Sequence, residues 1–516
     1  MSDPRILAID VGTQSVRAIV FDRAGEVVAA AQVMIIPYVS PQPGWAEQEA
    51  PYFFDRVAEA CQRLWSEVDP GTLTGVTLTS QRGTVINLDA DGQPLRPAMI
   101  WPDDRRVHDV PPLGGLWGAA FRLAGVSETI AGFQANAETN WIRRHQPEIW
   151  EKTAHFVLLS GYLTYRLTGR LIDSVGCQVA YIPFDFKALR WAGDRDWKWP
   201  ALGLTRSQLI PVVTPGEPLG SVSAEASAAT GIPAGLPMIA AAADKACEVL
   251  GTGCVAPDAA CLSYGTTATI NTTQTRYVEV IPLVPPYPAA LPGAYNTEVQ
   301  IYRGYWLVSW FKQEFAVDLQ ARAAAEGVAV EALLDAMIKD LPPGADGLLL
   351  QPFWTPGVRD PGPEGRGAIL GFMASHGRAH LYRAILEGIA FGLRAARETI
   401  ERRTKAPIRE LKVAGGGSRS DVAMQLTADI FGMPASRAHL YEASALGAAI
   451  VASVGLGVHP SVQAASAAMT RPGERFEPDP RAQRTYDAIF RRVYTPMYGR
   501  LRPLYRALRE ITGLPE

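Results

Sequence analysis

The chain is poor in cysteine and has no excess of charge of either sign. Its 516 residues include five cysteines, an odd number that is thinly spread. This argues against a disulfide-stabilised scaffold and favours a reducing compartment. The net charge is −3 and the pI is near 6.2. A near-neutral chain gives no reason to expect a nucleic-acid or acidic-membrane partner.

Long apolar runs are also lacking. The longest uncharged apolar stretch, residues 445–458, contains three glycines and is too short to cross a bilayer, so it predicts a buried helix. The first residues lack the basic region, apolar core and cleavage site of a signal peptide. We therefore expect a cytoplasmic protein that does not act at a membrane.

Three of the cysteines, Cys247, Cys254 and Cys261, recur every seven residues. This spacing is too wide for a C-x-x-C metal motif, and no histidine lies near them in the sequence. The pattern therefore predicts small buried side chains and disfavours a metal site.

The length predicts two domains, because single cores stop growing at about 250–300 residues. We place the boundary between residues 250 and 251. Apolar patterns predict strands at 6–9, 16–21, 27–33, 76–79, 85–88, 261–270 and 412–414, and helices at 51–68, 379–403, 422–431 and 482–508. The Pro-rich stretch 281–292 predicts a surface loop. Each half contains a strand, a turn of small and hydroxyl residues and a second strand, which suggests a structural duplication.

Three glycine-rich turns contain the candidate phosphate-binding residues. The first is Asp10-Val11-Gly12-Thr13-Gln14-Ser15-Val16-Arg17, the second Tyr264-Gly265-Thr266-Thr267, and the third Gly415-Gly416-Gly417-Ser418 at a strand-to-helix junction. Backbone N–H groups approach phosphate closely where side chains are absent, and a helix N-terminus favours anions. Asp10 is suited to hold Mg²⁺ through water. One such turn also fits an ordinary tight connection, whereas three together predict a phosphate site.

From Ile6 to about Gly457 the chain resembles the FGGY carbohydrate kinases, which belong to the superfamily of actin, sugar kinases and heat-shock ATPases. The matching segments are Asp10–Thr13, Ser80–Gly83 with Asp89–Pro97, Ile100–Arg105, Ala243–Lys245, Gly367–Gly371, His380–Leu381, Ala384–Gly388, Ala414–Gly417 and Glu442–Ala449.

The resemblance implies an α/β fold of two actin-like (ribonuclease H-like) ATPase domains. Each is expected to hold a mixed five-stranded sheet flanked by helices, with a cleft between the domains that closes to exclude water. It implies that the N-terminal domain (1–250) binds the sugar and the C-terminal domain (251–516) binds the nucleotide. The expected activity is ATP-dependent phosphorylation of a hydroxyl of a small sugar or polyol, with ATP and Mg²⁺ as cofactors. A homodimer is possible, since many relatives are dimers.

The resemblance also implies roles for individual residues. Asp244 is the expected general base, which accepts the proton of the attacking hydroxyl, and Asp10 the expected metal residue. The expected substrate contacts are Gln81, Arg82, Trp101, Asp103 and Lys245, although Lys245 could instead favour ionised Asp244 or point away. The expected nucleotide and phosphate contacts are Gly12, Thr13, Gln14, Ser15, Arg17, Gly265, Thr266, Gly416, Gly417 and Ser420.

Several positions depart from the family pattern and leave the substrate open. Lys245 replaces the usual Gln after the catalytic Asp, Glu138 replaces a Lys, and Thr269 stands where glycerol kinases have an aromatic residue. Gln81-Arg82-Gly83 matches neither the glycerol-type Gln-Arg-Glu nor the xylulose-type Gln-Met-His. A ketopentose such as xylulose or ribulose thus competes with a polyol such as glycerol or erythritol.

Two other functions remain open at this point. One is a non-catalytic ATP-binding sugar sensor or chaperone-like member of the superfamily, against which the presence of Asp10, Thr13, Asp244 and Thr266 argues. The other is a kinase with a carboxylate acceptor, which the motifs around Gln81 and Trp101 disfavour.

Overall fold

The computed structural model describes residues 3–357 and 361–513. The chain forms two compact units, and neither is one continuous stretch. Unit 1 comprises Met1–Gly251, Tyr287–Tyr295 and Glu442–Thr470; unit 2 comprises Thr252–Pro286, Asn296–Tyr441 and Arg471–Glu516. The return of residues 442–470 to unit 1 differs from a single boundary at residue 250.

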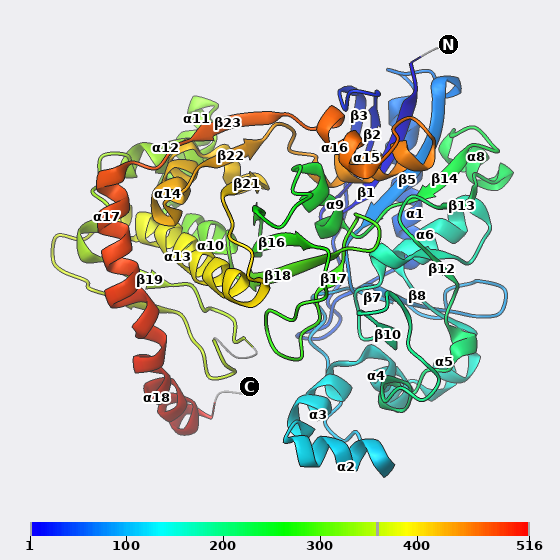
Figure 1. Cartoon of the computed structure of the whole chain (residues 1–516), viewed down its shortest axis with the longest axis horizontal. Helices are drawn as coiled ribbons and strands as arrows, with labels where there is room; N and C mark the ends of the chain where they lie inside the picture. The colour runs from blue at the N-terminus through cyan, green and yellow to red at the C-terminus, as the bar shows by residue number, and fades with distance from the viewer. Residues whose placement is uncertain (1–2, 358–360, 514–516) are drawn as a thin grey trace. The chain divides into compact units, whose positions relative to one another are not determined.

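Unit 1 is built on a mixed sheet (Figure 1). Strands β14, β5 and β1 are parallel to one another, while β2, β3 and β13 are antiparallel to their neighbours. Among the described residues the sheet has six strands, in the order β13-β14-β5-β1-β2-β3. The prediction of five was wrong, because β13 adds to the edge. The bounds are β13 (Pro218–Ser221), β14 (Pro237–Ala240), β5 (Leu73–Ser80), β1 (Arg5–Val11), β2 (Ser15–Phe21) and β3 (Val27–Met34).

Helices and smaller sheets surround this sheet in unit 1. The helices are α1 (Ala50–Leu64), α2 (Gly115–Ala124), α3 (Ser127–Asn136), α4 (Glu138–His145), α5 (Pro147–Lys152), α6 (Leu159–Thr168), α7 (Lys198–Leu202), α8 (Ala224–Thr230), α9 (Asp244–Gly251), α15 (Ala443–Gly455) and α16 (Val462–Met469). The other strands are β4 (Glu47–Gln48), β6 (Val85–Leu88), β7 (Ala98–Met99), β8 (His155–Leu158), β9 (Asp173–Ser174), β10 (Phe184–Asp185), β11 (Arg190–Trp191), β12 (Val212–Val213) and β17 (Tyr287–Pro288).

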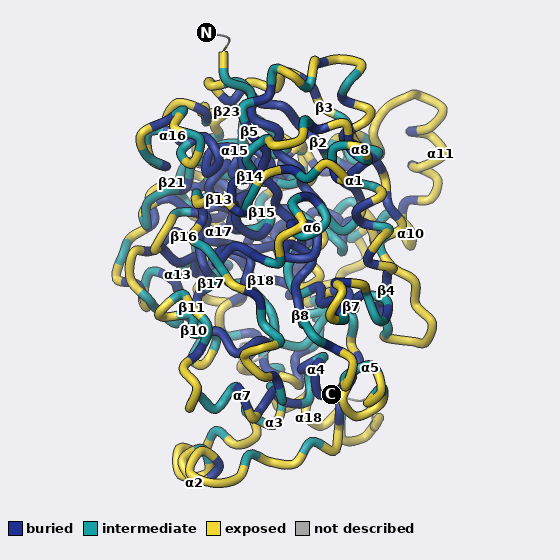
Figure 2. The backbone as a smooth tube through the Cα atoms, turned by 90° about the vertical axis from the view of Figure 1, so that its right-hand side faces the viewer, coloured by how far each residue is buried: buried dark blue, intermediate teal, exposed yellow. Residues whose placement is uncertain are grey.

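The central strands of unit 1 are apolar because both of their faces are covered. Ile6 to Ile9 on β1 are buried without alternation, as expected for a parallel strand inside a sheet. Figure 2 shows this burial as dark blue along β5 and β14, in contrast to the mostly exposed α2. On one side α15 packs on β1, β5 and α9. A Cβ on Gly447 would lie 1.9 Å from the carbonyl oxygen of Cys247, so glycine permits this close helix contact.

Unit 2 repeats the same pattern of strands. Its sheet runs β18-β16-β15-β21-β22-β23. Strand β15 is antiparallel to β16 and parallel to β21, as β1 is to β2 and β5, which confirms the suggested duplication. This sheet also exceeds five strands, because β23 is added antiparallel to β22. The bounds are β18 (Tyr295–Ile301), β16 (Ala268–Gln274), β15 (Ala259–Tyr264), β21 (Glu410–Ala414), β22 (Ala435–Ala438) and β23 (Pro472–Phe476).

The helices of unit 2 enclose a single large apolar core, to which the sheet and α13 contribute. They are α10 (Trp306–Phe315), α11 (Val317–Glu326), α12 (Val330–Ile338), α13 (Arg378–Thr404), α14 (Asp421–Phe431), α17 (Pro480–Ile489) and α18 (Thr495–Thr512), and a two-stranded sheet joins β19 (Leu349–Gln351) to β20 (Ala368–Leu370). The helix predicted over 482–508 is interrupted by a π-helical turn at Phe490–Tyr494.

All five cysteines are buried and none is in a disulfide, which confirms the prediction of small buried side chains at 247, 254 and 261. Within 3–357 and 361–513, no helix combines the length and the apolar character that a membrane span requires.

Candidate active site

The candidate site of unit 1 lies where three neighbouring parallel strands end. Asp10 is near the end of β1, Gln81 follows β5, and Asp244 comes four residues after β14 and begins α9. Carboxyl ends of adjacent parallel strands meet at one edge of a sheet, which is where α/β proteins bind ligands. The fold therefore brings together three residues that are far apart in the sequence.

Asp10 is a buried carboxylate, 5% exposed. Burial, together with the nearby charges of Asp244 and Glu248, raises its pKa to about 6, although Arg17 acts in the opposite direction. Arg17 Nη1 lies 3.4 Å from Asp10 Oδ2. The carboxylate is thus incompletely compensated, and hard oxygen ligands of this kind suit Mg²⁺.

Asp244 is half-buried in the first turn of α9. Burial raises the pKa of Asp244, while the charges of Arg82 and Lys245 lower it. Its Oδ1 accepts the Lys245 backbone N–H at 2.7 Å. The Lys245 ammonium group lies 2.8 Å from Glu248 Oε2. Lys245 therefore acts on Asp244 through its charge and backbone, while its side chain reaches Glu248.

The first glycine turn is closed by its own backbone. Gly12 N–H donates to Ser15 C=O at 3.1 Å, and Ile35 N–H donates to Gln14 C=O at 2.9 Å. The Ser15 side chain is buried, whereas Gln14 is exposed. This hydrogen bond occupies the backbone N–H of Gly12, which we expected to donate to phosphate.

Trp101, Thr13 and Gln81 form a hydrogen-bonded series. Trp101 Nε1 donates to Thr13 Oγ1, and Thr13 Oγ1 donates to Gln81 Oε1, each over 3.0 Å. The backbone N–H of Gln81 donates to Val11 C=O at 3.0 Å, which fixes the residue beside the end of β1. Trp101 is 46% exposed, so much of its ring remains open to solvent.

Arg82 lies beside this series. Its guanidinium packs over the ring of Tyr287 at 5.0 Å. Gly83 has a φ of +68°, which disfavours a residue with a side chain, and a Cβ there would lie 3.6 Å from the Trp101 Cβ. Position 83, where the glycerol-type pattern has Glu, thus has a left-handed backbone conformation that favours glycine.

Asp103 is occupied by structural contacts. Its carboxylate accepts two bonds from the Arg105 guanidinium, at 2.7 and 2.6 Å, and one from the Ala46 backbone N–H at 2.7 Å. Arg105 is in turn enclosed by the rings of Trp45 and Trp141. These contacts use the carboxylate oxygens that were expected to bind substrate, so Asp103 supports the loop that carries Trp101.

Unit 2 carries the second and third glycine turns side by side. Gly265 and Thr266 connect β15 to β16, and their carbonyl oxygens accept the backbone N–H groups of Tyr305 and Trp306. Thr266 is exposed. Gly415 follows β21, which pairs with β15, and a Cβ on it would lie 2.9 Å from Tyr264 backbone atoms. Its φ of +84° also favours glycine.

Gly416 and Gly417 differ in their surroundings. A Cβ on Gly417 would lie 2.2 Å from the ring of Tyr305, whereas a Cβ on Gly416 would meet no atom within 4 Å. The Ser420 hydroxyl accepts the Ala423 backbone N–H and so caps α14. Gly416 is therefore the most open of the three positions expected in the nucleoside pocket.

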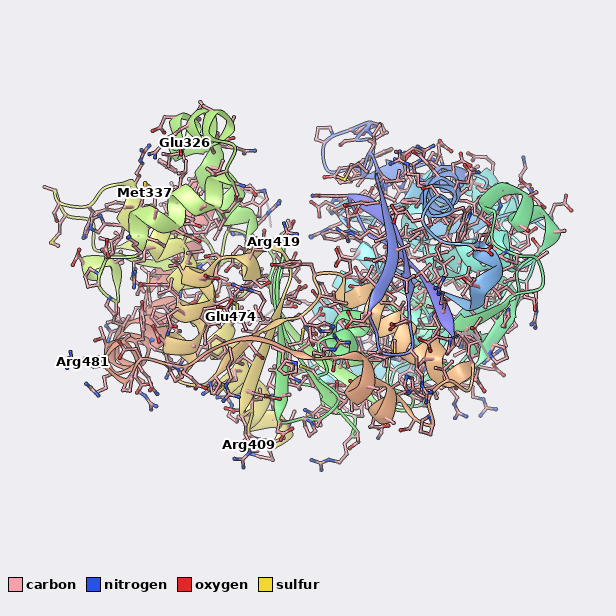
Figure 3. All side chains as sticks on the ribbon, turned by 90° about the horizontal axis from the view of Figure 1, so that it is seen from above. Glu326, Met337, Arg409, Arg419, Glu474 and Arg481 are labelled. Carbon is pink, nitrogen blue, oxygen red and sulfur yellow. The ribbon has the colours of Figure 1, made fainter. Side chains whose placement is uncertain are left out.

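Charged contacts hold this third turn in place. Arg437 donates to Ser418 C=O at 2.6 Å and pairs with Asp421 and Glu474, each at 2.5 Å. The Arg419 guanidinium packs over the Tyr441 ring at 4.3 Å. Figure 3 labels Arg419 and Glu474 on unit 2. The turn is thus tied to both α14 and β23.

Comparison with known proteins identifies the family. A model of the N-terminal domain of the FGGY family of carbohydrate kinases matches residues 5–251, and a model of the C-terminal domain matches residues 260–456. The chain belongs to the FGGY family of carbohydrate kinases. It is therefore a sugar or polyol kinase with the two-domain mixed α/β fold of that family, whose members use ATP.

Relatives of this FGGY kinase span nearly its whole length. An uncharacterized sugar kinase of Escherichia coli, YgcE, is 29% identical and covers 96% of this chain and 93% of its own. A glycerol kinase of Paracidovorax citrulli is 28% identical, with 94% and 97% covered. The crystal structure of a xylulose kinase from Rhodospirillum rubrum has a TM-score of 0.82 at 27% identity, with 97% and 100% covered.

A buried network that no sequence motif indicated supports the chain between β14 and Asp244 in this FGGY kinase. Asp173 accepts hydrogen bonds from Ser160 Oγ at 2.7 Å and Gln178 Nε2 at 2.8 Å, and burial raises its pKa to about 6. Gly176 C=O accepts Ala243 N–H at 3.1 Å. These contacts join segments that are distant in the sequence, so spacing did not reveal them.

Proposed function

We propose that this kinase transfers the terminal phosphoryl group of ATP to a hydroxyl of a ketopentose or a small polyol, with Asp244 as general base. The observation that carries the proposal is a pair of carboxylates on either side of β5: buried Asp10 near the end of β1, and half-buried Asp244 four residues after the end of β14. The charge of Asp244 contributes to the raised pKa of Asp10, so the two groups lie within electrostatic range.

Asp244 has the properties that a general base needs. Burial raises the pKa of Asp244, so the carboxylate accepts a proton more readily than an ordinary Asp. The charges of Arg82 and Lys245 act in the opposite direction and favour its ionised form. In the proposed step, Asp244 takes the proton of the attacking hydroxyl as the oxygen forms its bond to phosphorus. The bond from phosphorus to the bridging oxygen breaks, and ADP leaves with the electron pair.

Asp10 is proposed to hold Mg²⁺ through water. Mg²⁺ in such sites usually keeps several waters and binds through one or two carboxylates and the phosphates of the nucleotide. A buried carboxylate with a raised pKa is stabilised by a cation, so the chemistry of Asp10 fits this ion. When bound, Mg²⁺ would neutralise charge on the phosphate oxygens.

The other expected residues receive proposed roles that agree with their surroundings. Exposed Thr266 with Gly265 would bind phosphate, and Gly416 with Gly417 would admit the nucleoside. Arg82 and the ring of Trp101 would face the acceptor. The relatives named xylulose kinase and glycerol kinase support both acceptor classes.

The test is ADP release with Mg-ATP across xylulose, ribulose, glycerol, erythritol, aldoses and other three- to six-carbon polyols. We expect saturable turnover on one acceptor class and a loss of at least about a hundredfold in kcat for Asp244→Asn, the usual scale of a lost general base. Glu217→Gln, an exposed substitution in unit 1, is the matched control. A folded protein that binds ATP but releases no ADP with any acceptor would instead support the sensor function.

A further inference from the structure

The three residues that link β14 to Asp244 have no side chain that could hold them in place. Ala241, Ala242 and Ala243 lie after the end of β14 and before the start of α9, and all three are buried. A methyl group forms no hydrogen bond, whereas buried backbone N–H and C=O groups need partners. The position of Asp244 therefore depends on the groups that bind the backbone of residues 241–243.

Strand β5 supplies one of these groups. The side chain of Thr79 is completely buried, and its Oγ1 donates to Ala242 C=O at 2.8 Å. The Cys247 thiol lies 3.3 Å from the same carbonyl oxygen and is a weaker donor. The Thr79 hydroxyl thus makes the stronger of these two contacts.

The turn at residues 174–176 supplies two further groups. Ser174 Oγ accepts Gly176 N–H at 3.1 Å and donates to Ala241 C=O. Because a hydroxyl has a single proton, the proton of Ser174 is committed to Ala241. The backbone of the turn adds a second contact, since Gly176 C=O accepts Ala243 N–H at 3.1 Å.

Asp173 and Gly176 allow this turn to approach the alanines closely. Asp173 is buried, and its Oδ1 accepts Ser174 N–H at 2.7 Å, which fixes the start of the turn. A Cβ on Gly176 would lie 2.5 Å from the Cβ of Ala242, so only glycine permits this contact. Hydrogen bonds from two separate segments of unit 1 thus hold the backbone that leads into Asp244.

We propose that Thr79 and Ser174 are positioning residues for Asp244. By binding the backbone of residues 241–243, their hydroxyls fix the distance between the Asp244 carboxylate and the attacking hydroxyl of the acceptor. Both residues are at most 1% exposed, so they act through this backbone and not by contact with substrate. Misplacement of a reacting group by about 1 Å lowers a rate by as much as about a hundredfold. This inference rests on the proposed function of Asp244 as general base.

The first experiment compares Thr79→Val, which removes the hydroxyl at nearly constant shape, with Thr79→Ser, which keeps it. The matched control is Thr77→Val, because Thr77 is equally buried on β5 and its hydroxyl donates to Ile239 C=O at 3.0 Å, inside β14. Each valine variant leaves one buried carbonyl without its hydroxyl donor, so urea unfolding should show a similar loss of stability in both.

Steady-state kinetics with Mg-ATP and whichever of xylulose, ribulose, glycerol and erythritol is phosphorylated should separate the two valine variants. Thr79→Val should lower kcat about tenfold and leave KM for ATP and for the acceptor within about twofold. Thr77→Val should keep kcat within about twofold of the parent protein, and Thr79→Ser should restore most of the lost kcat. Ser174→Ala should behave like Thr79→Val, which provides a second variant if Thr79→Val does not fold.

A second experiment asks whether Thr79 acts through Asp244. In the Asp244→Asn background there is no base left to position, so adding Thr79→Val should lower the residual kcat by less than about twofold. A variant that only loosens the fold would lower kcat again by its full factor.

The outcomes separate this inference from the proposed function. Equal losses of kcat in Thr79→Val and Thr77→Val, or a further tenfold loss in the Asp244→Asn background, would overturn the positioning role and leave the base in place. Parental kcat in Asp244→Asn, or a parent protein that phosphorylates none of the four compounds, would remove the proposed function and the inference together.

Discussion

Arg17 Nη1 lies 3.4 Å from Asp10 Oδ2, directly opposite it in the β1–β2 pairing. Arg17 was expected to contact nucleotide, but this geometry gives it a second partner. Its positive charge holds the pKa of Asp10 below the value that burial alone would produce. Arg17, which lies on β2, therefore helps to set the pH range in which Asp10 is ionised.

Replacing Arg17 should move the acid limb of the pH–activity profile. In its proposed role Asp10 has to be ionised to hold Mg²⁺, so we expect activity above its pKa of about 6 and a loss of activity as the pH falls through that value. Arg17→Met should raise that pKa and shift the acid limb of kcat/KM upward by about one pH unit. Arg17→Lys, which keeps the charge, should shift it less. An unchanged acid limb in Arg17→Met would contradict the role of the ion pair.

Adjacent glycines of the third turn should respond differently to one added methyl group. Gly417→Ala places a Cβ 2.2 Å from the Tyr305 ring and should cost about 1–3 kcal/mol of unfolding free energy. Gly416→Ala meets no atom within 4 Å and should leave that energy nearly unchanged. Chemical denaturation measures both variants. If Gly416→Ala weakens ADP binding in calorimetry without loss of stability, the open position lines the nucleotide site.

Asp103→Asn should affect stability more than acceptor binding. The variant leaves the Arg105 guanidinium buried with one of its carboxylate partners lost, and breaking such a pair costs about 3 kcal/mol. Urea unfolding at pH 7 measures this change, and Asp104→Asn at the exposed neighbouring position is the control. A raised acceptor KM with wild-type stability would instead show that Asp103 contacts substrate.

Glu138→Gln should stabilise the protein most at alkaline pH. Burial raises the pKa of Glu138 to about 7, and its Oε2 is buried without a partner in the described structure. Because the folded-state pKa exceeds the unfolded one, its contribution to stability is full below about pH 4.5 and is lost as the pH rises through 7. The gain should therefore reach about 2 kcal/mol at pH 8 and be smaller at pH 5. Equal gains at both values, or a similar gain from exposed Glu148→Gln, would contradict this account.

Local patterns in the sequence predicted much of the fold. The strand at 85–88 and the helix predicted at 422–431 agree with β6 and α14 to within one residue, because their apolar spacing and turns are local signals. The helix at 482–508 was predicted as continuous. Pro496 has no N–H to bond the preceding turn, and the π-helical turn at Phe490–Tyr494 lies just before it.

The candidate site was less predictable, because its contacts join distant segments. Motifs indicated Asp10, Gln81 and Asp244, whose strand ends the fold does bring to one sheet edge. Nothing in the sequence indicated that the Arg105 guanidinium would bind the Asp103 carboxylate. Nor did it indicate that the Arg82 guanidinium would pack on the Tyr287 ring. The sequence thus indicated which residues belong to the site, whereas tertiary packing determines which partner each of them contacts.

Helix α15, which packs on β1, β5 and α9 from more than 190 residues beyond Gly251, has a consequence for synthesis of the chain. While the ribosome is still making unit 2, the side of the first sheet on which α15 packs lacks this helix, so we expect part of its apolar surface to stay uncovered. A fragment truncated at residue 251 would keep that surface permanently and should aggregate unless the segment 442–470 is supplied as a separate peptide. We therefore expect unit 1 to complete its packing only after translation has passed residue 470.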